Sequence, residues 1–152
     1  MRNHEWLVNE LKFLLKNYFS DVKLTNPIQI KFGREAQFRF GSIKLVKKRF
    51  GGLGGWRRLA RGEPEKSLIT ITSMFANDDV PEDVVRYTIA HELCHYAHGF
   101  SSYNKRLFKF PHHGGIVNKE LRDRGAKGLI AAYKAWLTTY RNKILSNRKI
   151  FS

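Results

Sequence analysis

The chain has 152 residues, the length of one ordinary domain, and 42% of them are apolar, which excludes a disordered polypeptide. Its single cysteine, Cys94, excludes an internal disulfide, and no apolar run approaches the roughly 20 residues that span a bilayer. We therefore expect one cytoplasmic domain over residues 1–152, without membrane contact. The sequence does not indicate an oligomeric state.

The net charge of +15 is distributed unevenly. Residues 31–66 carry eleven basic and three acidic side chains, and residues 119–152 carry nine and two, whereas residues 67–118 between them carry four and five. Basic clusters attract polyanions through their summed field, so DNA is a candidate partner. A solubilising surface is the alternative interpretation.

Hydrophobic periodicity predicts the elements of the first half in chain order: a helix over residues 4–19, a strand over 28–32, and a second strand or hairpin over 38–45. A glycine-rich loop follows and lacks the lysine of a phosphate-binding loop. Beside it lies a group of side chains that could stack on a base and bind phosphates, with a solvated loop as the alternative. These candidates are Trp56, Arg57, Arg58 and Arg61.

The second half begins with a β-branched, alternating strand over residues 68–72. Pro81 then opens a helix that runs to Gly99, and a loop, a short helix over 115–124 and a long final helix from Leu129 follow. An N-terminal helix, a small sheet and C-terminal helices in this order predict an α+β fold.

The helix after Pro81 contains an HExxH motif, in which His91 and His95 differ by only about 40° around the helix axis and by about 6 Å along it. Both imidazoles can therefore reach one metal ion, and zinc is the usual metal for such a pair. Glu92 is next to the first histidine and can act as the general base that takes a proton from an attacking water.

A catalytic zinc usually has three protein ligands, and four residues are candidates for the third. His98 shares the helix face but lies another 4.5 Å or so along the axis, so it is poorly placed. His112, His113 and Glu120 lie in or beside the next predicted helix. Spacing alone does not decide among them.

The motif and its flanks resemble the SprT-like zinc metallopeptidases and related small bacterial HExxH hydrolase domains. The similarity covers about a third of the chain, and rests on Pro81, on residues 88–95 (TIAHELCH) and on the pair His113-Gly114. It implies a small zincin-like fold, zinc as cofactor, His113 as the third ligand and protease activity, which in some members acts on DNA-bound proteins. Longer members carry a C-terminal four-cysteine zinc ribbon, whereas in this sequence no cysteine follows Cys94.

These observations predict a zinc-dependent metallopeptidase with His91, His95 and His113 as ligands and Glu92 as general base, acting on protein or peptide substrates, some of them bound to nucleic acid. The strand over 68–72 is expected to align an extended substrate by edge pairing. The alternative is a basic nucleic-acid-binding module with a structural or latent zinc site. The presence of Glu92 argues against it, because a structural site needs no base.

Overall fold

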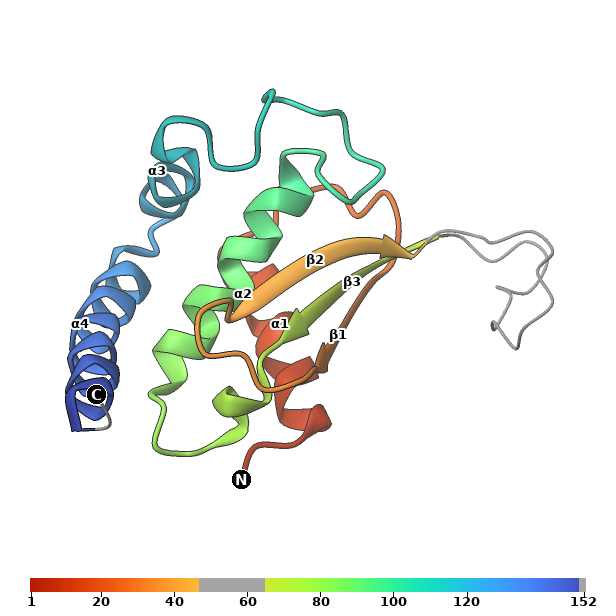
Figure 1. Ribbon diagram of the computed structural model, residues 1–152. Helices are drawn as coiled ribbons and strands as arrows, with labels where there is room; N and C mark the ends of the chain where they lie inside the picture. The colour runs from red at the N-terminus through yellow and green to blue at the C-terminus, as the bar shows by residue number, and fades with distance from the viewer. Residues whose placement is uncertain (47–64, 151–152) are drawn as a thin grey trace, which may run out of the picture.

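The computed structural model describes residues 1–46 and 65–150, and has the α+β architecture expected from the sequence. The described residues form four α-helices, a three-stranded sheet and two short 3₁₀ turns (Figure 1). In chain order these are α1 (His4–Asn17), β1 (Ile28–Phe32), β2 (Gly41–Val46), β3 (Lys66–Ile71), η1 (Ser73–Ala76), α2 (Glu82–Ala97), η2 (His113–Gly115), α3 (Ile116–Asp123) and α4 (Lys127–Ile150).

The sheet has the order β1-β3-β2, so β3 is its central strand. β3 pairs in parallel with β1 and antiparallel with β2, and Ile69 is the partner of both Ile30 and Ile43. Ser67, Ile69 and Ile71 are buried, whereas the residues between them are half-buried, as expected where alternate side chains face a covering layer. The expectation that β3 offers a free edge to a substrate is therefore wrong, because both of its edges are paired; β2 and β1 are the edge strands.

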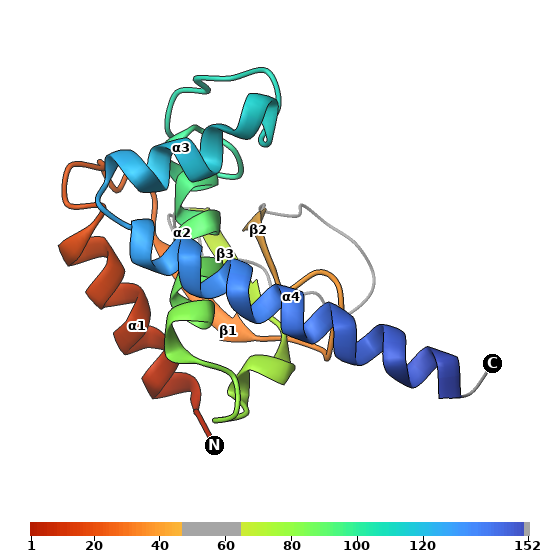
Figure 2. The same ribbon diagram turned by 90° about the vertical axis from the view of Figure 1, so that its left-hand side faces the viewer.

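α2 is the central element of the molecule. α1 and α2 lie against one face of the sheet, and α3 and α4 lie on the far side of α2 (Figures 1 and 2). Because α2 is covered on both sides, side chains around most of its circumference are buried, including Val84, Ile89 and Leu93. Pro81 is its N-cap and Glu82 and Asp83 occupy its first turn, which favours the start of a helix at this point.

An aromatic cluster attaches α4 to the segment that leads into β2. Phe40 is buried and stacks on Phe75 at 5.2 Å between ring centroids, and Trp136 meets both rings edge-on at 5.4 and 5.5 Å. Tyr140 stacks on Trp136 at 4.7 Å. The C-terminal part of α4 extends past the rest of the molecule (Figure 2). Within the described ranges, no helix is both long and apolar enough to cross a membrane.

Candidate metal centre

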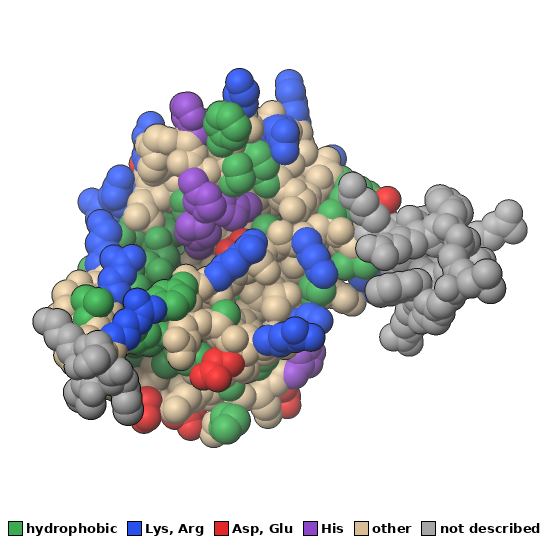
Figure 3. All heavy atoms as spheres, viewed as in Figure 1, with side chains coloured by type: hydrophobic (Ala, Val, Ile, Leu, Met, Phe, Trp, Pro, Cys, Tyr) green, Lys and Arg blue, Asp and Glu red, His purple; other side chains and the backbone are tan. Residues whose placement is uncertain are grey.

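Three histidines converge on one point beside α2. His91 and His95 project from successive turns of α2, and His112 reaches them from the loop before η2. One ring nitrogen from each lies within 4.8 Å of the others, and the Nε2 atoms of His91 and His112 are 3.0 Å apart. This is the only such group of potential ligands among the residues that the structure describes. Figure 3 shows histidine side chains gathered on this face of the molecule.

The environment of His91 and His95 favours the neutral imidazole, which is the form that binds a metal. Burial, with the neighbouring His95 and His112, lowers the pKa of His91 to about 3. Burial, with His112 and His98, lowers the pKa of His95 to about 4. The buried Nδ1 of His95 has no hydrogen-bond partner in the described protein. Three convergent imidazoles of this kind fit a metal ion.

Glu92 lies beside this cluster and is only 6% exposed. Burial raises the pKa of its carboxyl to about 7, and the positive charge of Arg39 acts in the opposite direction. Gly41, the first residue of β2, lies close to it: a Cβ built on Gly41 would be 3.3 Å from Glu92 Oε1 and 2.8 Å from Thr88 Cγ2. Glycine at this position therefore lets the edge strand approach the proposed base.

The third histidine differs from the one expected. His112 occupies the place predicted for His113, and His113 lies outside the cluster of three. His113 is the first residue of the η2 turn, where Gly114 and Gly115 have left-handed φ values of +58° and +70°. Neighbouring side chains on such a tight turn point in different directions, so only one of the two histidines can face α2.

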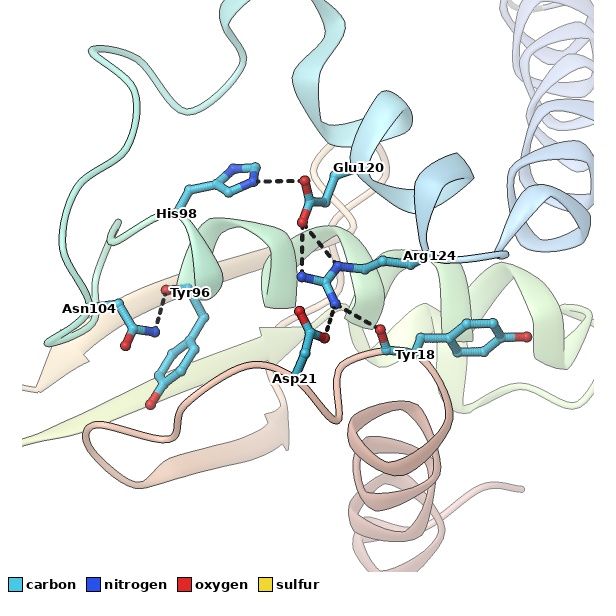
Figure 4. A network of polar contacts seen from close by, with 7 residues as sticks. All are labelled: Tyr18, Asp21, Tyr96, His98, Asn104, Glu120 and Arg124. Atoms are coloured by element: carbon cyan, nitrogen blue, oxygen red, sulfur yellow. Dashed lines mark hydrogen bonds and ion pairs between the residues drawn. The ribbon is translucent and has the colours of Figure 1, made fainter.

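Glu120 and His98, the other candidate ligands, belong to a separate polar network (Figure 4). The buried His98 Nε2 lies 3.5 Å from Glu120 Oε2, and Glu120 also pairs with Arg124 at 2.9 Å. The Arg124 guanidinium continues the network by donating to the Tyr18 carbonyl at 2.9 Å and to Asp21. These contacts join α3 to α2 and to the end of α1. His98 and Glu120 therefore connect helices and are not part of the histidine cluster.

Two further side chains near the motif, Cys94 and Tyr103, take no part in the histidine cluster. Cys94 is fully buried, and burial raises the pKa of its thiol. The Tyr103 hydroxyl accepts a hydrogen bond from the Glu65 amide at 3.2 Å, and Tyr103 does not line the cleft described below. The proposed nucleic-acid contacts lie outside the described residues: Trp56, Arg57, Arg58 and Arg61.

An open cleft of about 350 Å³ contains the three histidines and Glu92. Its walls come from the segment before β2 and the first residues of β2, from α2, from the loop after α2, and from Tyr133 on α4. Sequence reasoning missed Arg39 and Gly41 as parts of this site. The glycine inside the strand predicted over 38–45 was the one local signal, since glycine in a strand often marks a close approach.

Comparisons of this chain with protein-family models, with curated proteins and with solved structures found no match. The resemblance to SprT-like peptidases thus rests on the motif residues alone.

Proposed function

We propose that this protein is a zinc-dependent metallopeptidase of the SprT-like kind. The observation that carries the proposal is the convergence of three histidines beside a buried glutamate in an open cleft. His91, His95 and His112 would hold the zinc. A bound zinc would supply Lewis acidity, lowering the pKa of a water and polarising the carbonyl that is attacked.

The chain's own groups supply the proton transfers and the substrate alignment. The Glu92 carboxylate takes the proton of the attacking water and returns it to the leaving amine, as a base with a pKa near the working pH can do. The outer edge of β2 begins at Gly41, next to Glu92, and is unpaired by any other described strand. An extended peptide can add to such an edge through main-chain hydrogen bonds, which favours a peptide substrate.

The rival interpretation is a structural zinc in a basic binding module. Structural zinc sites are almost always closed by four protein ligands. Only three side chains meet in the described part of this chain, and they face a cleft. The donor set and the cleft therefore support a catalytic centre over a structural one.

The test compares zinc-loaded wild type with the Glu92→Gln variant on an unstructured protein such as casein. Glu92→Gln removes the base and no ligand, so it should retain zinc and lose at least 100-fold in kcat/KM. Hydrolysis by Glu92→Gln at the wild-type rate would refute the assigned mechanism. Absence of chelator-sensitive hydrolysis by the wild type across unstructured substrates would refute the function.

A second candidate function, binding of DNA, is favoured by a basic stripe on α4. The stripe is formed by side chains seven residues apart, all exposed, on a helix that contains no acidic residue. Seven residues are almost two helical turns, so the stripe runs along the helix with a drift of only about 20° per step and is about 31 Å long. Its members are Lys127, Lys134, Arg141 and Arg148. Figure 3 shows basic side chains along the side on which α4 lies.

The stripe also leads to the cleft. Arg148 Cζ lies 5.7 Å from the centroid of the Phe38 ring, and Phe38 lines the cleft. A polyanion held along α4 would therefore lie next to the peptidase site, which favours substrates that are themselves bound to DNA.

The test is a salt titration of duplex DNA binding. Each phosphate contact contributes roughly −0.9 to the slope of log K against log salt, so Lys134→Ala/Arg141→Ala should reduce the magnitude of the slope by up to about 2. Lys12→Ala/Lys16→Ala removes the same charge from exposed positions on α1 and is the matched control. Equal losses in both variants would refute an interface on α4.

A further inference from the structure

Among the described residues that line the cleft, Arg39 is the one permanently charged basic residue. Apart from the three histidines, the charged lining residues are Arg39 and Glu92. Glu92 is almost completely buried, whereas Arg39 is exposed. A substrate that enters the cleft therefore meets an accessible positive charge and little accessible negative charge.

The backbone that carries Arg39 is held firmly at the wall of the cleft. The next residue, Phe40, is anchored in the aromatic cluster, and its carbonyl accepts a hydrogen bond from the Thr72 amide at 2.8 Å. Gly41 then pairs with Ile71 in the sheet and lies against Glu92. Arg39 thus projects from a fixed point beside the proposed base, although its side chain retains rotamer freedom.

The guanidinium of Arg39 is also unengaged by the described protein. None of the ion pairs between described residues includes it, whereas Arg86 and Arg124, the arginines that join helices, are each paired with at least two carboxylates. A planar guanidinium binds a carboxylate through two parallel hydrogen bonds, and this geometry discriminates against an uncharged amide. A carboxylate of the substrate would supply the ion pair that Arg39 lacks in the described protein.

We propose that Arg39 forms a subsite for a carboxylate of the peptide substrate, so that the enzyme prefers an acidic side chain, or a free C-terminus, close to the bond that it cleaves. The inference rests on the proposed peptidase function and deepens it. The carboxylate would lie near β2, since Arg39 is two residues before the strand whose outer edge faces the substrate.

The experiment uses zinc-loaded full-length protein and peptides blocked at both ends that differ at one position. Glu, Gln and Lys are placed in turn at each position near the cleaved bond, and kcat/KM is measured for each peptide. A further peptide with neutral side chains is tested with a free and with an amidated C-terminus. At the best position we expect Glu to exceed Gln by up to about fivefold, the value of a good exposed ion pair. A preference seen only with the free C-terminus would assign the subsite to that carboxylate.

Three variants identify the residue responsible. Arg39→Gln should bring the Glu-to-Gln ratio to about one, and Arg39→Glu should favour the Lys peptide. Arg34→Gln, at an exposed position in the same β1–β2 connection but outside the cleft lining, should leave the ratio unchanged. The Glu-to-Gln ratio is measured within one enzyme. Any effect of Arg39 on the proton transfer by Glu92 is therefore common to both peptides and cancels.

Two results would overturn the inference alone: equal rates for Glu and Gln at every position and for free and amidated C-termini, or an acidic preference that survives in Arg39→Gln. Failure to cleave any peptide or unstructured protein would instead overturn the proposed function and this inference with it.

Discussion

Gly41→Ala should disturb the proposed base without removing a metal ligand. The new Cβ would lie 2.8 Å from Thr88 Cγ2 and 3.3 Å from Glu92 Oε1, so either the strand or α2 has to move. Overpacking of this kind costs about 1–3 kcal/mol. For a domain of this size that corresponds to a fall in Tm of about 2–12 °C. A shift of Glu92 by a fraction of an ångström also misaligns the proton transfer, so kcat should fall about 10-fold or more while zinc content is unchanged.

Gly128→Ala is the matched control, because a Cβ on Gly128, in the first turn of α4, would meet no atom within 4 Å. Like Gly41→Ala, this substitution lowers the conformational entropy of the unfolded chain, which stabilises the folded state by about 0.4–1 kcal/mol. It introduces no steric clash. Thermal unfolding of the two variants therefore isolates the cost of the contact.

A second substitution tests the cause of the effect. Thr88→Ser removes Cγ2 and keeps the hydroxyl, which donates to the Val84 carbonyl at 3.0 Å. Gly41→Ala/Thr88→Ser should therefore recover much of the stability lost in Gly41→Ala. If Gly41→Ala matched Gly128→Ala in both Tm and kcat, the close approach of β2 to Glu92 would be refuted.

Three further predictions concern the metal and the packing of the helices. His112→Ala should lose most of the zinc measured by elemental analysis, whereas His113→Ala should keep it; the reverse result would restore the ligand expected from the family resemblance. Removal of the metal with a chelator should lower the Tm, because zinc at 100 times its Kd adds about 2.7 kcal/mol to stability; an unchanged Tm in protein shown to have lost zinc would contradict this coupling. The hydrogen bond from Arg124 lowers the pKa of Asp21 below its usual 3.8. The free energy that ionised Asp21 adds to folding is therefore present above pH 3.8, and it is lost as the pH falls through the lower pKa of the folded state. Acid titration of Asp21→Asn, followed by circular dichroism, should show a weaker dependence of stability on pH in this window than wild type, and identical curves would contradict it.

The helices and strands were predictable because their signals are local. The β-branched alternation that ends at Ile71 and the proline before Glu82 mark β3 and α2 within a few residues of their observed bounds. The order of the strands was not predictable in this way, since it depends on which strands pair. β3 is central because both β1 and β2 pair with it, and no feature of its own sequence reports this.

The same distinction between local signals and tertiary packing applies to the residues of the candidate site. His91, Glu92 and His95 lie on one helix, so their relative positions follow from helical geometry. The choice between His112 and His113 depends on the conformation of a turn that contains two left-handed glycines, and the two adjacent histidines share nearly the same local sequence. Arg39 and Gly41 could not be assigned because about fifty residues separate them from Glu92, and only tertiary packing brings them together.

The number and kind of metal ligands are the most direct test of the proposed metal centre. X-ray absorption at the zinc edge, measured on zinc-loaded protein whose stoichiometry is known from elemental analysis, reports both. We predict about one zinc per chain, held by three imidazole nitrogens at about 2.0–2.1 Å, with at least one oxygen ligand from solvent and no sulfur. A protein that cannot be loaded with zinc, or a zinc bound through the Cys94 sulfur, would contradict it.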